Sequence, residues 1–188
     1  MTEQDTSEPA LGPVVRSQTE WEAEVVRWLL TAADDKRQAL EEWQRSGVAL
    51  LACGDVFEAV RIPAHIVQAA AATDEPDRLD KYLAHALFGG PVIIDPHSRW
   101  YYALVPPRTA HRWRHRRAFE TEFLRTGSRL GVPHPRLSAR GAQVALSYWV
   151  VPMGAPGALC SPRAVFEMTS YGRFVHEAIT AEKETQRS

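Results

Sequence analysis

Several features that would assign a function at once are missing from this sequence of 188 residues. It has only two cysteines, Cys53 and Cys160, which are too few and too far apart for a disulfide framework or a zinc site. We therefore expect reduced thiols in a cytoplasmic protein. No run of 18 or more apolar residues occurs, so we expect no membrane span, and the polar residues 1–5 are unlike a signal peptide.

A strong net charge and the familiar catalytic motifs are also absent. The formal net charge is -1, which excludes a global field that attracts nucleic acid or membranes. The chain has no Gly-x-x-x-x-Gly-Lys-Ser/Thr, Gly-x-Ser-x-Gly or Gly-x-Gly-x-x-Gly pattern, and neither cysteine lies in a typical nucleophile context. These absences favour a binding protein without a cofactor over an enzyme.

The patterns that are present predict an α+β fold. Helical periodicity is found at 18–33, with Thr19 and Glu22 as a capping box, and at 34–45. Paired apolar runs predict hairpins at 48–53 with 56–62, and at 92–94 with 100–105. Further helices are expected at 63–73, 76–87, 111–125 and from Pro162 to a break near Tyr171 and Gly172, and a further strand at 144–151.

Strand pairs separated by helices predict a mixed or mostly antiparallel sheet of about five strands, flanked by helices. The second hairpin, around residues 89–107, is expected at the centre of this sheet. We expect polar tails at 1–17 and 181–188, and a helical pair at 18–46 packed on an α+β domain at 47–180.

The distribution of charge points to one candidate binding segment. Residues 108–140 contain nine Arg and two Glu, whereas residues 1–45 contain ten acidic and five basic side chains. Arginine binds phosphate bidentately, and an interleaved Trp offers a surface for base stacking. A helix with this composition is typical of a nucleic-acid or nucleotide interface, but a solvated face paired with the acidic helices explains it too. The candidate residues are Arg108, Arg112, Trp113, Arg114, Arg116 and Arg117.

Other residues offer weaker candidate sites. His111 and His115 have the spacing of metal ligands on a helix, but no third ligand is evident and the surrounding arginines oppose a cation. Asp55, Glu58 and Asp95 at strand ends could hold Mg²⁺, although the turns around Asp55 and Asp95 already account for those two residues. His97 and Arg99, in the turn after Asp95, could contact a phosphate or serve only the turn.

Part of the chain resembles short actinobacterial proteins with a domain like the N-terminal domain of bifunctional DNA primase-polymerases. The matching segments are residues 55–63, 90–92, 102–107, 131–133 and 147–152. The resemblance implies an RRM-like palm sheet. An active member would carry an acidic pair on one strand, a further Asp and a His on a facing strand. Here Asp55 and Glu58 are spaced differently and residues 100–105 contain no His, which implies a reduced, catalytically inactive relative.

Three functions are therefore open. The first is a non-catalytic domain that binds nucleic acid or a nucleotide through the arginine-rich helix, in a replication, regulatory or mobile-element context. The second is a protein-interaction module with Trp21, Trp28 and Trp43 as anchors and the arginines facing an acidic partner. The third is a Mg²⁺-dependent nucleotidyl-transfer enzyme.

Overall fold

The computed structural model describes residues 17–113, 122–138 and 147–186. Its helices are α1 (Gln18–Leu29), the short 3₁₀ helix η1 (Leu30–Ala32), α2 (Lys36–Ser46), α3 (Ala64–Ala71), α4 (Pro76–Ala86), α5 (Thr109–Trp113) and α6 (Pro162–Thr185). Its strands are β1 (Val48–Ala52), β2 (Glu58–Pro63), β3 (Val92–Asp95), β4 (Trp100–Val105), β5 (Glu122–Leu124), β6 (Arg129–Pro133) and β7 (Tyr148–Val151). This is the α+β class that the sequence predicts.

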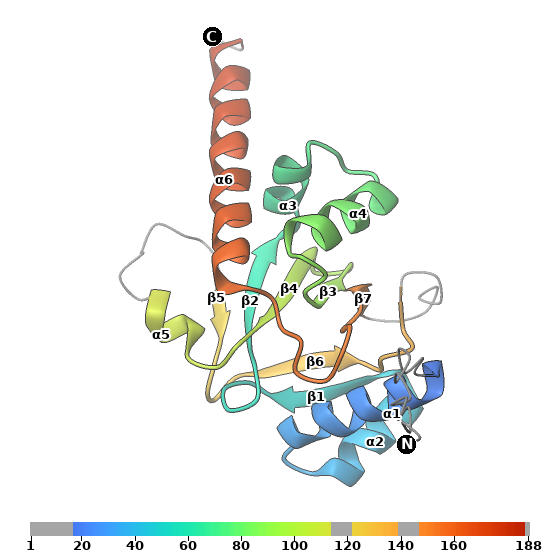
Figure 1. Cartoon of the computed structure of the whole chain (residues 1–188). Coiled ribbons are helices and arrows are strands. Elements are labelled where there is room, and N and C mark those ends of the chain that lie inside the picture. Colours follow the sequence, from blue (N-terminus) through green and yellow to red (C-terminus); the bar gives the residue numbers. More distant parts are fainter. Residues whose placement is uncertain (1–16, 114–121, 139–146, 187–188) are drawn as a thin grey trace, which may run out of the picture.

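The strands form two antiparallel sheets, one of five strands in the order β5-β2-β4-β3-β7 and one of two strands, β1-β6. Because β4 lies between β2 and β3, the unit β2–α3–α4–β3 is a split β-α-β arrangement. The β3–β4 hairpin is confirmed, and β4 is the central strand of the larger sheet. In Figure 1, α6 stands beside the larger sheet and extends well past it, while α1 and α2 lie below β1 and β6.

The first predicted hairpin is wrong, because its two strands belong to different sheets. β1 pairs with β6, with Leu50 opposite Gly131, whereas β2 lies between β5 and β4. Between them, Gly54 adopts φ +133° and donates its N–H to the Phe57 carbonyl at 2.7 Å. The turn therefore moves the chain from one sheet to the other instead of returning it along the same ladder.

The helix predicted at 111–125 is also wrong at its C-terminal end. The described part of α5 ends at Trp113. Residues 122–124 form the edge strand β5, which pairs with β2. Phe123 pairs with Val60 across the two strands. Phe123 and Leu124, which fall within the helix predicted at 111–125, are thus strand residues.

The helix termini follow local capping chemistry. In α1 the capping box is formed by Ser17 and Glu20, two residues earlier than the predicted pair of Thr19 and Glu22. The side chain of Asp35 caps α2 at its start, and Gly47, with φ +75°, caps its C-terminal end. α6 begins at Pro162, as predicted, with Ser161 at its N-cap position.

Two hydrophobic clusters cover opposite faces of the five-stranded sheet. On one face, Val60, Tyr101 and Ala103 pack with residues of α3, α4 and α6. On the other face, Leu104 and Trp149 pack with residues of α1, α2, β1 and β6. The larger sheet is therefore the middle layer of the molecule.

The three tryptophans of the N-terminal helices belong to this second cluster and are not exposed anchors. Trp43 is 5% exposed and donates its Nε1–H to the Val132 carbonyl at 2.9 Å. Trp21 is half-buried and donates to the carbonyls of Met153 and Gly154, both at 3.1 Å. Trp28 packs against Phe57. The protein-interaction hypothesis thereby loses its predicted anchors.

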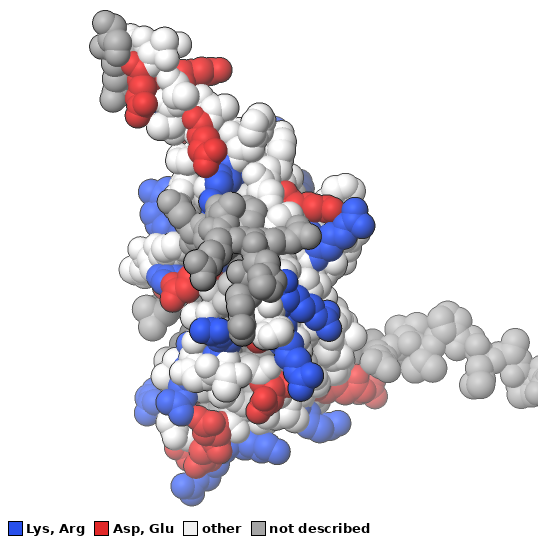
Figure 2. Space-filling view, turned by 90° about the vertical axis from the view of Figure 1, so that its left-hand side faces the viewer, with Lys and Arg blue, Asp and Glu red and all other residues white. Residues whose placement is uncertain are grey.

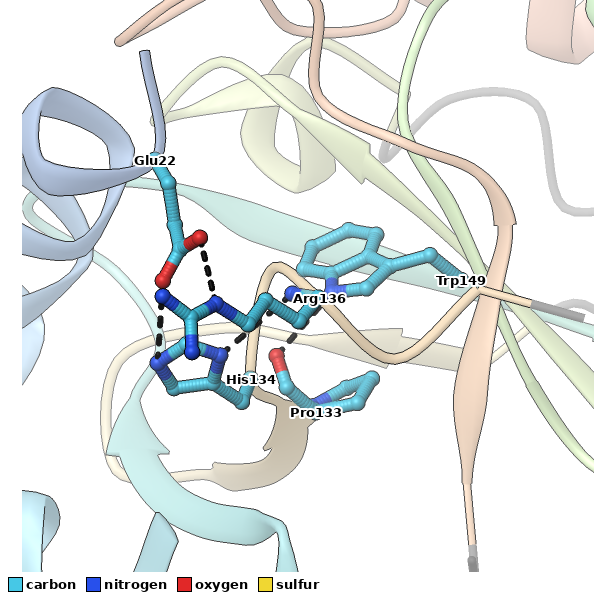
Figure 3. Close-up of polar contacts among 5 residues, drawn as sticks. All are labelled: Glu22, Pro133, His134, Arg136 and Trp149. Atoms are coloured by element: carbon cyan, nitrogen blue, oxygen red, sulfur yellow. Dashed lines mark hydrogen bonds and ion pairs between the residues drawn. The ribbon is translucent and has the colours of Figure 1, made fainter. Parts of the chain in front are cut away.

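A polar cluster fixes α1 to the segment after β6 (Figure 3). Glu22 accepts a hydrogen bond from Arg136 Nε at 2.5 Å, and the His134 Nδ1 accepts the Arg136 backbone N–H at 3.3 Å. Burial is the main cause that lowers the pKa of His134, and Arg136 lowers it further, although Glu22 acts in the opposite direction. The neutral imidazole that these causes favour is the form whose Nδ1 can accept a hydrogen bond.

The last helix is longer than predicted. α6 passes through Tyr171 and Gly172 without a break and continues to Thr185, beyond Ala181, where the sequence predicts a polar tail. No helix in the described part of the chain is long and apolar enough to cross a membrane.

Candidate functional site

The arginine-rich segment is only partly described. Arg108 and Arg112 are exposed at the start and near the end of the described part of α5, and His111 is exposed beside them. Arg114, His115, Arg116 and Arg117 lie outside the described residues. Figure 2 views the side of the molecule that carries α5 and β5, where Lys and Arg side chains flank the middle of the face and acidic groups are interspersed.

Trp113 is a packing residue and not an open stacking surface. Its ring meets Phe123 edge to face at 5.2 Å between centroids and Phe166 at 5.3 Å. These contacts join α5 to β5 and α6. These contacts account for Trp113 as a packing residue, and its role in base stacking stays a prediction.

Glu58 holds the start of α5 in place. Its side chain is 5% exposed, and its two oxygens accept the backbone N–H groups of Arg108 at 3.1 Å and Ala110 at 2.8 Å. A carboxylate at a helix N-terminus satisfies free amides and complements the helix dipole.

Asp95 serves its own turn in the same way. Its carboxylate accepts the backbone N–H groups of His97 at 3.0 Å and Ser98 at 3.2 Å, and the Ser98 hydroxyl at 2.6 Å. His97 is exposed in this turn.

The predicted Mg²⁺ site is not assembled. Glu58 is level with Val105 and Asp95 with Trp100, which places them five residues apart along β4, about 17 Å at ~3.4 Å per residue. Asp55 is exposed in the turn before β2. Within residues 17–113, 122–138 and 147–186, no group of three or more acidic, His or Cys side chains is placed to hold a metal ion.

An arginine and two aromatic side chains meet at the Asp95 end of the sheet. The Arg61 guanidinium lies 4.0 Å from the centroid of the Trp100 ring, and Tyr102 faces Arg61 across the β2–β4 ladder. Arg61 Nη1 also contacts Glu122 at 2.6 Å. Arg61 Nε is buried and has no hydrogen-bond partner among the described residues, so the face of the Trp100 ring meets a guanidinium that is incompletely paired.

Beside Trp100 lies an open hollow of about 560 Å³, which we call the Arg99–Trp100 hollow. It is lined by Pro63, Ala64, His65, Ser98, Arg99 and Trp100. Arg99 is exposed with φ +59°, and its carbonyl accepts the Ala64 N–H at 2.9 Å, which fixes this turn to the first residue of α3. The N-cap of α3 is Pro63, which supplies no side-chain acceptor.

A second hollow of about 220 Å³ lies on the face of the five-stranded sheet that α3 and α4 cover. It shares Ala64 and Arg99 with the first hollow. We call it the Asp80 hollow. Its polar side chains are Gln68 of α3, Asp74 from the α3–α4 connection, Asp80 of α4, Arg99, Tyr101 of β4 and Tyr148 of β7. Of the residues predicted as sites, Arg99 alone is common to both hollows.

Sequence reasoning missed Trp100 and the residues of the Asp80 hollow other than Arg99. Tyr101 and Tyr148 lie in strands whose apolar patterns predict only core, and Asp80 lies on the polar side of a regular helix. One signal was available. Acidic residues are frequent from Asp74 to Asp80, more so than the helix start marked by Pro76 requires.

Comparison with known proteins found no family model, curated protein or solved structure that matches the chain. A functional conclusion therefore rests on the geometry described above.

Proposed function

We propose that this protein binds a nucleotide or nucleic acid, without catalysing a reaction, and that a phosphate group is held in the Arg99–Trp100 hollow. The observation that carries the proposal is that an exposed arginine and a tryptophan line one hollow at the start of α3. A guanidinium pairs with phosphate oxygens, a helix N-terminus attracts anions, and an indole ring stacks on a base. A replication, regulatory or mobile-element role in the cytoplasm is part of the proposal.

The arginine-rich segment that begins at Arg108 would extend the interface for a strand but not for a single nucleotide. Arg108 is anchored by Glu58, at the end of β2 opposite to the Arg99–Trp100 hollow. A ligand that contacts both places must span the sheet, which a polynucleotide can do. Arg112, Arg114, Arg116 and Arg117 would be further phosphate contacts for such a strand.

The resemblance to primase-polymerase domains remains a second support for the proposal. The split order of β2, β4 and β3 is compatible with a palm-like sheet. Because Glu58 and Asp95 are engaged by backbone amides at opposite ends of the sheet, a binding role is favoured over nucleotidyl transfer.

Binding can be tested by fluorescence anisotropy with labelled 12-residue single-stranded DNA and RNA, and by calorimetry with nucleotides, at two salt concentrations. We expect Arg99→Ala and Trp100→Ala each to weaken binding about tenfold, in line with ~1–3 kcal/mol for a stacked base, and added salt to weaken it further. Arg78→Ala is the matched control, because Arg78 is exposed, pairs with Glu75 at 3.8 Å and lines neither hollow. Unchanged affinity in both hollow variants, or no binding of any of these ligands, would refute the proposal.

A further inference from the structure

The Asp80 hollow contains a set of polar groups that the proposed phosphate contact does not use. They come from α3, the α3–α4 connection, α4, β4 and β7, and converge on one small cavity. Their convergence is set by the sheet: Tyr101 and Tyr148 are the two cross-strand neighbours of Ile94, one on each side. At ~4.8 Å between strands, the two tyrosine backbones are roughly 10 Å apart, and Ile94 forms the floor between them.

Two of the polar groups in this hollow, Tyr101 and Asp80, have raised pKa values. Tyr101 is 4% exposed and lines the hollow together with Tyr148 and Asp80. Burial, with smaller effects of Tyr148 and Asp80, raises the pKa of Tyr101 to about 12. Burial and the charge of Asp77 raise the pKa of Asp80 to about 6. A poorly solvated carboxyl that shares a cavity with two tyrosine side chains is a group that a ligand can satisfy.

The two hollows meet at Arg99, which links a phosphate position to this second cavity. Ala64 and Arg99 line both, so a ligand held by Arg99 can extend a second part between α3 and α4. A volume of about 220 Å³ accommodates a flat heterocycle but not a strand of nucleic acid. The arrangement fits one nucleotide with its phosphate at Arg99 and its base over Ile94.

From this arrangement, and resting on the proposed function, we infer that the Asp80 hollow is the base subsite for a guanine mononucleotide. Guanine presents two adjacent N–H donors, N1–H and N2–H, which match the two oxygens of the Asp80 carboxylate. The Gln68 amide can donate to the guanine O6, and the Tyr101 and Tyr148 hydroxyls supply further donors along the cavity. Asp80, Gln68 and Tyr148 are half-buried and Tyr101 is buried, so a wrong base that leaves them unpaired in the cavity is disfavoured.

The test measures binding of GMP, AMP, CMP, guanosine and inorganic phosphate to the full chain by calorimetry at pH 7.5. For the unchanged protein we expect GMP to bind at least tenfold more tightly than AMP or CMP, and guanosine and phosphate to bind more weakly than GMP. Asp80→Asn should remove most of the preference for guanine while leaving the affinity for phosphate unchanged. Arg99→Ala should weaken all three nucleotides about equally and keep the order of bases. Tyr148→Phe, which keeps the ring, should weaken GMP several-fold.

The outcomes separate this inference from the proposed function. If oligonucleotides bind in an Arg99-dependent manner but GMP does not, the base subsite is wrong and the phosphate site stands. If GMP binds with no preference over AMP, or if Asp80→Asn and Tyr148→Phe leave the preference intact, the guanine assignment is overturned. If neither GMP nor any oligonucleotide binds, both fail. Thermal unfolding of each variant shows that a loss of binding is not a loss of fold.

Discussion

At the scale of single residues, Asp80 makes the stability of the protein depend on pH. Its pKa of about 6 in the folded chain lies above the usual value of 3.8, because burial and Asp77 disfavour the charged form. Between about pH 4 and 6 the folded state therefore keeps a proton that the unfolded state has lost. The contribution of Asp80 is fully present below about pH 4 and is lost as the pH rises through 6.

Replacing Asp80 by Asn should recover this loss at neutral pH. After a discount for partial exposure we expect roughly 1–2 kcal/mol of added stability at pH 7.5, and no change at pH 3.5. Thermal unfolding of both proteins at several pH values measures it. Glu41→Gln, which alters an exposed pair with Arg37, is the control and should change stability by no more than a few tenths of a kcal/mol. If Asp80→Asn destabilised the protein equally at all pH values, the raised pKa of the Asp80 carboxyl would be contradicted.

Single residues also show what the sequence cannot reveal about the site. Glu58 and Asp95 were predicted as metal ligands from their residue type and their place at strand ends. Glu58 is instead satisfied by amides 50 and 52 residues further along the chain, and Asp95 by its own turn. The local bond of Asp95 follows from its turn sequence, but the long-range bond of Glu58 depends on where α5 returns, which no local pattern encodes.

At the scale of elements, Gly172 controls how closely α6 approaches α3. A Cβ at this position would lie 2.3 Å from the Ile66 carbonyl oxygen and 3.1 Å from the Ala70 Cβ. Alanine is the better helix former by about 1 kcal/mol, so on an isolated helix Gly172→Ala would stabilise. Here we expect a net loss of about 2–3 kcal/mol, because two backbones must separate.

Chemical denaturation provides the measurement for Gly172→Ala, with Gly154→Ala as the matched control. A Cβ at Gly154 meets nothing within 4 Å, and this substitution should be neutral or stabilise by up to about 1 kcal/mol. An increase in stability for Gly172→Ala would mean that α3 and α6 pack less closely than the structure indicates.

The same glycine explains one limit of sequence-based prediction. Gly172 follows Tyr171 and favours a helix break when only local propensity is considered. Propensity and periodicity locate most elements, including the β3–β4 hairpin and α4 with Leu79 and Leu83 buried. They do not choose the partner of β1, because a strand that is apolar on both faces fits either sheet. They also miss β5, since three residues are too few to show a period.

At the scale of the whole molecule, α1 and α2 complete the core and are not an appendage. Val25, Leu29 and Trp43 are each no more than 5% exposed and pack in the cluster that contains Leu51, Val132 and Trp149. At ~1.5–3 kcal/mol for each large apolar side chain, their burial is worth roughly 5–9 kcal/mol. That sum is comparable with the whole stability of an ordinary domain, about 5–15 kcal/mol.

The C-terminal end of α6, unlike α1 and α2, contributes no buried side chain to the core. From Glu177 to Thr185 every residue of the helix is exposed, and Figure 1 shows this part extending beyond the sheet. Removing residues 180–188 therefore deletes no buried side chain of the described chain. We expect the melting temperature of that truncated protein to stay within about 2 °C of the full chain, because a stability change below ~0.5 kcal/mol moves the melting temperature by only about that much.

A chain that begins at Val48 should behave quite differently, because it leaves Leu51, Val132 and Trp149 facing solvent. We expect it to lose the cooperative thermal transition and to bind a hydrophobic dye, as collapsed chains without fixed packing do. Circular dichroism melts of this chain, of the chain lacking 180–188 and of the full protein make the comparison. A sharp transition in the chain from Val48, near that of the full protein, would show that the sheet and its remaining helices form an independent domain and that α1 and α2 only cover it. Loss of the transition in that chain alone would show that both faces of the five-stranded sheet must be covered before either is stable.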